Sequence, residues 1–289
     1  MKGIILAGGL GTRLYPITTI TTKSLLPIYN KPMIFYPLSM LMLAGIRDIL
    51  IITTPQDSKT FESLLGNGDK YGITITYDTQ PTPAGIAQAF IIGEDFIGKD
   101  DVCLILGDNI FYGKTLPLIL KTSYNKVLNG TKSIIFASRV NNPERYGVIE
   151  FGEDDSLISI EEKPISPKSN HAVVGLYFYK NDVVAKAKKI MPSGRGELEI
   201  TDINELYLNE SRLDVQKLDS VFWLDTGTHD SLVEASNFIK TVENREGKRV
   251  SCLEEIAFKY NYIDRKKLKQ IISNYNNDYG KYLEELLNE

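Results

Sequence analysis

The chain has 289 residues, and its 33 Lys and Arg residues against 37 Asp and Glu residues give a formal net charge of −4. With 43% hydrophobic and 24% charged residues, it has the composition of a globular protein, which excludes a disordered or fibrous chain. The mild acidic excess, without any basic block, argues against nucleic acid as a partner.

Cysteine usage and hydropathy exclude two further classes of protein. The two cysteines, Cys103 and Cys252, form no paired motif, which argues against a disulfide scaffold or a zinc site. The longest uncharged apolar stretch, residues 32–46, is shorter than the ~18 residues that a membrane span needs. The apolar start of the chain is also too short for a signal peptide. We therefore expect a cytoplasmic protein with no membrane partner.

Short apolar runs alternate with helical patterns along most of the chain, which predicts an α/β fold. Between the first two runs, residues 33–44 predict a helix that Gly45 ends, with Pro37 kinking its first turns or moving its start later. Five runs of strand length are typical of strands buried on both faces of a largely parallel sheet, namely residues 3–7, 49–53, 102–106, 133–137 and 221–224.

The middle and the end of the chain differ from this alternation. Residues 146–151, 157–160 and 173–179 predict antiparallel additions that make the central sheet mixed, though still mostly parallel. From residue 243 onward the chain is rich in Lys, Asn and Glu. We predict a catalytic domain of residues 1–240 and a C-terminal helical extension, residues 241–289, with helices at 253–260, 265–275 and 279–287.

The first predicted strand ends in a segment with three glycines in four positions, at residues 8–11. Glycines let the backbone approach a ligand and point several N–H groups at anionic oxygens. Arg13 and Lys23 follow and add the charge that a polyphosphate demands. Neither the dinucleotide fingerprint nor the G-x-x-x-x-G-K-[ST] loop fits this segment. A flexible turn without a ligand is the alternative interpretation.

Carboxylates follow strand-like runs at widely separated places in the chain. Asp108 and Asp225 each come after an apolar run, and Glu161, Glu162 and Lys163 come after another. Ligands of open α/β sheets bind outside the carboxyl ends of the strands. Two carboxylates suit Mg²⁺, which leaves room for phosphate oxygens, although each aspartate alone could simply form a turn. The residues by themselves therefore predict an α/β enzyme with a phosphate-and-magnesium site.

Long motifs in a fixed order carry a more specific signal. Together they resemble the signature of the sugar-phosphate nucleotidyltransferases, and the resemblance runs over the whole chain. The motifs are LAGGLGTRL at residues 6–14, TKSLLP at 22–27, KP at 31–32, LGDN at 106–109, PERYGV at 143–148, EEKP at 161–164, RGELEITD at 195–202 and WLDTGTH at 223–229.

The resemblance implies a Rossmann-like fold, a homotetramer and a reaction that uses Mg²⁺. In the implied reaction, the thymidylyl group of dTTP passes to glucose 1-phosphate and gives dTDP-glucose and pyrophosphate, as the first step toward dTDP-L-rhamnose and related deoxysugars. One alternative is a relative that uses UTP or another nucleotide. A non-catalytic regulatory protein on the same fold is more remote, because it should have lost some of the charged residues Arg13, Lys23, Asp108, Lys163 and Asp225, all of which are present.

The resemblance also implies residue roles. Those five charged residues would be catalytic, and Asp108 and Asp225 would hold Mg²⁺. The nucleotide would contact Leu6, Gly8, Gly9, Gly11, Thr12, Arg13, Gln80, Gly85 and Asp108. The sugar phosphate would contact Asn109, Tyr146, Gly147, Glu162, Lys163, Val173 and Arg195. The resemblance further implies a second site between subunits for the inhibitor dTDP-L-rhamnose, and we expect Tyr112, Gly113, Arg249 and Cys252 to belong to it. We expect a chain ending near Glu243 to lose inhibition and tetramer mass before it loses the active site.

Overall fold

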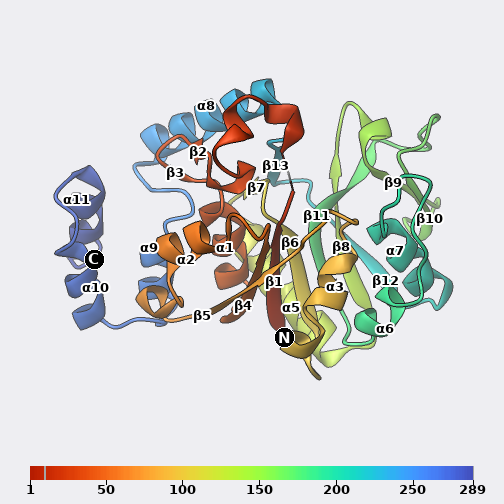
Figure 1. Cartoon of the computed structure of the whole chain (residues 1–289), viewed down its shortest axis with the longest axis horizontal. Coiled ribbons are helices and arrows are strands. Elements are labelled where there is room, and N and C mark those ends of the chain that lie inside the picture. The colour runs from red at the N-terminus through yellow and green to blue at the C-terminus, as the bar shows by residue number, and fades with distance from the viewer. Residues whose placement is uncertain (10, 289) are drawn as a thin grey trace.

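The computed structural model describes residues 1–9 and 11–288, and within them nine strands form one mixed sheet with helices on both faces (Figure 1). Leu10 of the glycine-rich segment lies outside the described residues. The parallel part of the sheet has the strand order β6-β1-β4-β5. These strands are β1 (Lys2–Ala7), β4 (Asp48–Thr53), β5 (Thr74–Thr79) and β6 (Val102–Leu106).

The other half of the sheet is largely antiparallel and is built around β11 (His171–Tyr179). This strand pairs antiparallel with β6, β8 and β9, and its register shifts between Val173 and Tyr177. The predicted antiparallel additions are therefore confirmed. The remaining strands are β8 (Ser133–Arg139), β9 (Gly147–Phe151), β10 (Leu157–Glu162) beside β9, and β12 (Leu213–Lys217), which is parallel to β8.

Two short ribbons lie outside the main sheet. β7 (Asn109–Tyr112) pairs antiparallel with β13 (Phe222–Asp225), and β2 (Pro27–Ile28) pairs with β3 (Lys31–Pro32). The prediction that residues 221–224 form a strand of the buried parallel sheet is therefore wrong. Phe222 is exposed and the rest of β13 is half-buried, so the apolar run marks a strand without marking its sheet.

The predicted helix after β3 is α1 (Phe35–Leu43), which starts later than residue 33, as Pro37 allowed. Pro37 lies in the first turn, where a missing N–H leaves no helical hydrogen bond unmade. The other helices before the C-terminal extension are α2 (Ser58–Leu65), α3 (Gln88–Ile92), α4 (Glu94–Ile97), α5 (Leu116–Asn129), α6 (Val183–Ala187), α7 (Ile200–Asn209) and α8 (His229–Glu246). Single 3₁₀ turns lie at Thr12–Leu14, Ile17–Thr19, Lys23–Leu25, Asp69–Tyr71 and Pro143–Arg145.

The side chains of each strand point alternately to the two faces of the sheet, so the hydrophobic core has one part on each face. Ile4 packs with Phe90 of α3 and Ile203 of α7, whereas Ile5 packs in a cluster that includes Leu38 of α1 and Leu120 of α5. Neighbouring residues of a strand point to opposite faces, so β1 contributes to both layers. The apolar runs are long because both faces of these strands are covered.

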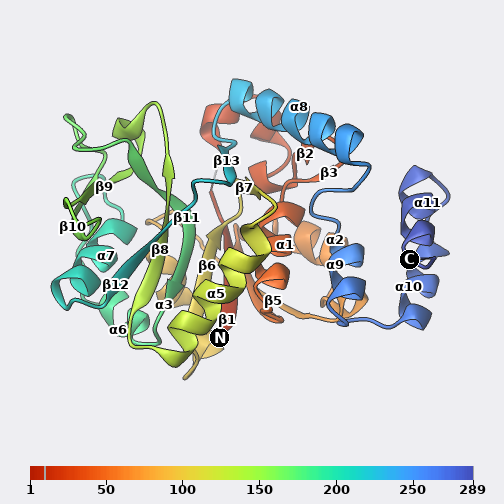
Figure 2. The same cartoon turned by 180° about the vertical axis from the view of Figure 1, so that it is seen from behind.

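The C-terminal helices share the core of the sheet. They are α9 (Leu253–Lys259), α10 (Arg265–Ile272) and α11 (Asp278–Glu285), as predicted apart from their exact ends. Leu253, Leu268 and Leu283 belong to the same buried cluster as Ile5 and α1. Both views place α10 and α11 at the end of the molecule remote from β10 (Figures 1 and 2). No helix in the described part of the chain is both long and apolar enough to cross a membrane.

Candidate active site

A cleft of about 560 Å³ opens where β6 ends and β11 begins. It is lined by all seven residues predicted to contact the sugar phosphate, together with Arg13, Asp108 and Asp225. A second hollow of about 210 Å³ adjoins it and shares Asp108 and Leu106 with it. Of the predicted nucleotide residues, this hollow includes Leu6, Gly9, Gln80, Gly85 and Asp108, and Lys23 also lines it.

Glycine is required at two positions of the loop after β1. Gly11 has a left-handed backbone with φ of +61°, which favours glycine. A Cβ atom at Gly8 would lie 2.6 Å from Oε1 of Gln80, so any side chain there would displace that amide. Thr12 and Arg13 follow in an exposed 3₁₀ turn. The loop thus brings bare backbone up to the hollow that Gln80 lines.

Lys23 and Asp108 form an ion pair where the cleft meets the adjoining hollow. Nζ of Lys23 lies 2.5 Å from Oδ2 of Asp108, although the two residues are far apart in the sequence. Burial works to raise the pKa of the Asp108 carboxyl, but the charge and hydrogen bond of Lys23 outweigh it and hold the pKa below its ordinary value. Asp108 is therefore ionised, with its cation supplied by the chain itself.

Asp225 has weaker partners than Asp108. Its nearest cation is Arg145, whose Nη2 lies 3.7 Å from Oδ2, and the Tyr146 hydroxyl donates to the same oxygen at 3.4 Å. Burial, followed by the negative charge of Asp108, raises the pKa of Asp225 above its ordinary value. An additional cation between the two carboxylates would relieve this repulsion.

The β7–β13 ribbon fixes both aspartates. Asp225 stands opposite Asn109 in the ladder, and the hydroxyl of Thr226 donates to the backbone oxygen of Asp108 at 2.8 Å. The Asn109 amide donates to Oδ1 of Asp108 at 2.8 Å, and its oxygen accepts from the Trp223 indole at 2.7 Å. Asn109 lines the cleft as expected for a sugar contact, and its amide also holds the Asp108 carboxylate in place.

Two charged residues on the far side of the cleft are oriented by neighbours. Glu162 ends β10, and its Oε2 accepts from the Thr201 hydroxyl at 2.6 Å. Arg195 donates to Glu199 at 2.8 Å and lies 3.4 Å from Glu162. Lys163, the residue after Glu162, has a positive φ of 45°, which is a sparsely populated conformation. Its exposed side chain lines the cleft. Cationic and anionic groups therefore alternate along this wall.

The donor set suits magnesium better than a transition metal. Across residues 1–9 and 11–288, no three His, Cys, Asp or Glu side chains gather as a metal site. The two carboxylates that share the cleft, Asp108 and Asp225, match the usual Mg²⁺ arrangement of one or two protein carboxylates plus phosphate oxygens.

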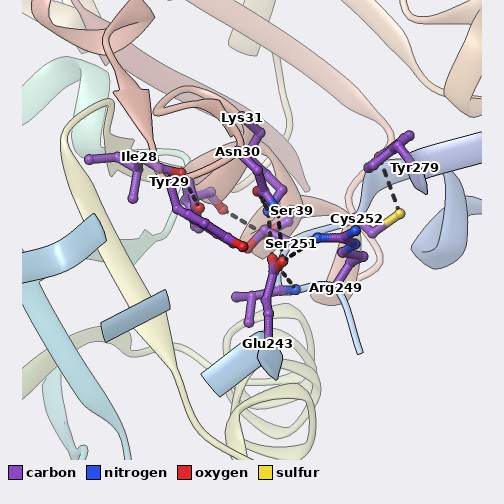
Figure 3. Close-up of polar contacts among 12 residues, drawn as sticks. Ile28, Tyr29, Asn30, Lys31, Ser39, Glu243, Arg249, Ser251, Cys252 and Tyr279 are labelled. Carbon is purple, nitrogen blue, oxygen red and sulfur yellow. Dashed lines mark hydrogen bonds and ion pairs between the residues drawn. The ribbon is translucent and has the colours of Figure 1, made fainter. Parts of the chain in front are cut away.

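A separate cleft of about 300 Å³ lies between β7, the start of α5 and the start of the C-terminal extension. The four residues predicted for a regulatory site, Tyr112, Gly113, Arg249 and Cys252, all line it. Arg249 also donates to Glu243 at 3.0 Å, within the polar cluster drawn in Figure 3.

Some residues of the cleft were not predicted as site residues. Arg145 and Trp223 lie within motifs that the sequence displays, so their position beside Tyr146 and Asp225 was a usable signal. Gln88, which contacts Gln80, carries no such signal, because the contact depends on how the loop between them folds.

Comparison with known proteins extends over the whole chain. The nucleotidyl transferase family model matches residues 2–242. A Neisseria meningitidis glucose-1-phosphate thymidylyltransferase is 56% identical over 289 residues, covering 99% of each chain. A Mycobacterium tuberculosis protein of the same name is 53% identical, with the same coverage of each chain.

Solved structures confirm the fold. A Bacillus anthracis protein assigned as a glucose-1-phosphate thymidylyltransferase, solved with sucrose, is 44% identical with a TM-score of 0.76, covering 82% of this chain and 94% of that one. A UDP-glucose pyrophosphorylase solved with UDP-glucose is 26% identical with a TM-score of 0.73, covering 83% and 98%.

Proposed function

The chain belongs to the nucleotidyl transferase family, and from that premise we propose that it is a glucose-1-phosphate thymidylyltransferase. The observation that carries the proposal is the identity of 56% over essentially the full length of a relative with that name. The product would be dTDP-glucose, which can enter the synthesis of dTDP-L-rhamnose and related deoxysugars.

The reaction is a displacement at phosphorus. An unprotonated phosphate oxygen of glucose 1-phosphate forms a bond to the α-phosphorus of dTTP. The bond from that phosphorus to the α,β-bridging oxygen breaks, and its electron pair leaves with pyrophosphate. A phosphate monoester has a second pKa of ~6, so it is already a dianion at neutral pH and needs no general base. Catalysis then depends on positioning two anions and stabilising charge.

The charged residues divide naturally between the two substrates. We assign Arg13 and Lys23 to the triphosphate, since both stand at the loop of Gly8, Gly9 and Gly11. Lys163 and Arg195 would hold the sugar phosphate from the opposite wall. Glu162 and Tyr146 offer an acceptor and a hydroxyl to the glucose ring.

We assign Mg²⁺ to Asp108 and Asp225, because Lys23 pairs closely with Asp108 alone, while Asp225 has only the longer contact to Arg145 and a raised pKa. When bound, the ion would neutralise charge on the phosphate oxygens. Arg145 and Tyr146 keep Asp225 directed at the cleft, and Asn109 does the same for Asp108.

A pyrimidine other than thymine is the second candidate for the nucleotide. It is favoured by the shared fold of the UDP-glucose pyrophosphorylase solved with UDP-glucose. Pyrophosphate release with glucose 1-phosphate and each of dTTP, UTP, CTP, ATP and GTP tests both candidates. The proposal expects the highest kcat/KM with dTTP, and a clearly higher value with UTP would replace it by the alternative.

For the cleft lined by Tyr112, Gly113, Arg249 and Cys252 we propose a regulatory role in a homotetramer. Support comes from its lining, which shares no residue with the catalytic cleft, and from the exposed Lys248 and half-buried Arg249 within it, which suit a nucleoside diphosphate. Phe222 and Val233 expose apolar surface near β13 and α8 that subunit contact would bury. Light scattering of the full chain tests the assembly, and a monomeric mass would contradict it.

A further inference from the structure

Two glutamine side chains meet next to the hollow beside the glycine loop, and Gln80 is the one that lines it. Gln80 follows β5 and is almost fully buried, with 4% of its surface exposed. Gln88 is the first residue of α3 and is half-buried. Nε2 of Gln80 donates to Oε1 of Gln88 at 2.7 Å. The contact spans the Pro81–Ala84 turn and joins the two ends of this loop.

Backbone groups determine which way round each amide stands. The N–H of Ala84 donates to Oε1 of Gln88 at 3.3 Å, so this atom has to be the oxygen. Nε2 of Gln80 donates to the carbonyl oxygen of Gly85 at 3.3 Å, so that atom has to be the nitrogen. A backbone N–H only donates and a carbonyl only accepts, which leaves one orientation for each side chain.

The consequence is that Gln80 presents its oxygen to the glycine loop. This oxygen lies where a Cβ atom on Gly8 would come within 2.6 Å of it, and Gln80 lines the same hollow as Gly9 and Gly85. The N3 atom of thymine or uracil carries a hydrogen and would donate to such an oxygen. The N3 atom of cytosine is an acceptor and would face it without a hydrogen bond.

We propose that Gln88 is a specificity-determining positioning residue, which selects bases with an N3 hydrogen by holding the amide of Gln80 in one orientation. This inference rests on the proposed function, since it assumes that the pyrimidine binds beside Gln80. Gln88 acts through Gln80 and need not touch the substrate. If Gln88 only braced the loop, its loss would weaken all nucleotides equally.

The test compares dTTP, dUTP and dCTP, which differ in the base alone. Gln88→Met removes the acceptor at similar size, so that only the longer hydrogen bond to the Gly85 carbonyl, at 3.3 Å, still opposes rotation of the Gln80 amide. We expect the ratio of kcat/KM for dTTP over dCTP to fall about tenfold, the usual scale for one mismatched buried hydrogen bond. The ratio of dTTP over dUTP should stay unchanged, because both bases carry the N3 hydrogen.

Two further variants separate orientation from packing. Gln88→Glu keeps an acceptor for Gln80 and Ala84, so its dTTP-to-dCTP ratio should remain within about twofold of the unchanged protein, well inside the effect of a lost hydrogen bond. Gln88→Lys offers only donors, so it should shift the ratio toward dCTP even if the Met variant folds poorly. In a Gln80→Met background, Gln88→Met should leave the dTTP-to-dCTP ratio unaltered, because the Gln80 amide through which Gln88 acts is already absent.

The outcomes distinguish a failure of the role of Gln88 from a failure of the proposed function. A Gln88→Met or Gln88→Lys protein with an unchanged dTTP-to-dCTP ratio would overturn the role of Gln88. A collapse of the ratio in Gln88→Glu would also overturn it, because the acceptor would then not be the cause. Failure of the unchanged protein to form a sugar nucleotide from dTTP would instead refute the proposed function.

Discussion

Asp108 and Asp225 face one cleft with different partners. Asp108 has the Lys23 ammonium at 2.5 Å, whereas Asp225 has only Arg145 at 3.7 Å and a tyrosine hydroxyl. The repulsion between them raises the pKa of Asp225 after burial has already raised it. Asp225 is therefore the carboxylate whose charge depends most on a cation brought in with the substrate.

Asp225→Asn keeps the shape of this side chain and removes its charge. If Asp225 is a magnesium ligand, kcat should fall by ~10²–10³, as it does when a preorganised electrostatic group is lost. Pyrophosphate release at limiting Mg²⁺ measures the effect. Asp219→Asn, at an exposed position six residues earlier, is the control and should behave like the unchanged protein. Near-normal turnover by a well-folded Asp225→Asn protein would refute the assignment.

Lys163→Ala tests the other wall of the cleft. Because Lys163 would both hold and partly neutralise the sugar phosphate, the substitution should raise KM for glucose 1-phosphate about tenfold and lower kcat, on the scale of one charge-assisted hydrogen bond. Calorimetry should find dTTP binding little changed. Lys168→Ala is the matched control, since Lys168 pairs with Glu150 on the surface. Lost dTTP binding with intact sugar-phosphate binding would exchange the two phosphate roles.

The sequence carried unequal information about these residues. Asp108 was predictable because it comes after β6, and ligands gather at such strand ends. The same pattern found Asp225, although this residue ends β13, which pairs with β7 outside the main sheet. Arg195 and Gln80 came only from resemblance to a family, since nothing in their local pattern marks them. Gln88 could not be predicted from the sequence, because its role depends on where the loop places the backbone groups of Ala84 and Gly85.

At the scale of elements, one buried carboxylate joins the β2–β3 hairpin to the end of α8 (Figure 3). Glu243 accepts from Lys31 Nζ at 2.9 Å, from Asn30 Nδ2 at 2.7 Å, and from Arg249 and the backbone N–H of Val250 at 3.0 Å each. The side chains of Glu243 and Lys31 are each 3% exposed. Losing one partner would leave an uncompensated buried charge.

Glu243→Gln should therefore lower the free energy of unfolding at pH 7 by about 3 kcal/mol, the range for breaking a buried pair. Urea unfolding measures this loss. Asp214→Asn breaks the half-exposed pair of Lys132 and Asp214 and serves as the control, with a cost of about 0–1 kcal/mol. Equal costs in the two variants would contradict the account of this cluster.

The same cluster predicts a pH dependence. Burial works to raise the pKa of Glu243, but Lys31 first, then Arg249 and Asn30, hold it below its ordinary value. Its stabilisation is therefore complete above the unfolded pKa of about 4.3 and is lost as pH falls through the lower folded value. The stability difference between the unchanged protein and Glu243→Gln should shrink below about pH 4. A difference that stays constant from pH 7 to 3.5 would contradict this.

The elements themselves were predictable where burial makes a clear pattern. The strands β1, β4 and β6 were predictable as short apolar runs, because both of their faces are covered by other parts of the protein. β5 was missed because its sequence, TITYDT, contains no apolar run, and its period-two alternation at the edge of the sheet is the strand signal that was overlooked. β13 was placed in the wrong sheet, because an apolar run does not encode its partner strand.

At the scale of the whole molecule, the C-terminal extension is continuous with the catalytic core. The predicted boundary at residue 240 falls inside α8, which runs on to Glu246. Leu253, Leu268 and Leu283 share one buried cluster with the sheet. A chain ending near Glu243 would expose that cluster, so we now expect it to lose stability along with regulation. Regulation is better tested by a single substitution.

Lys248→Glu is that substitution. Lys248 is exposed and lines the proposed regulatory cleft, where its positive charge would contact the diphosphate of a nucleoside diphosphate sugar. Reversing the charge should raise the concentration of dTDP-L-rhamnose needed for half-inhibition about tenfold, while kcat stays unchanged. Inhibition curves measure the shift, and Lys240→Glu, exposed on α8, is the control. Unchanged inhibition in Lys248→Glu would remove this cleft from the account.

The proposed function requires one active site to convert dTTP and glucose 1-phosphate into dTDP-glucose and pyrophosphate. Phosphorus NMR of the full-length protein with both substrates and Mg²⁺ observes every phosphorus atom of that reaction at once. We expect the three dTTP resonances and the glucose 1-phosphate resonance to decline together while those of dTDP-glucose and pyrophosphate appear in equal amounts. Unchanged spectra with dTTP, or formation of orthophosphate without a sugar nucleotide, would contradict it.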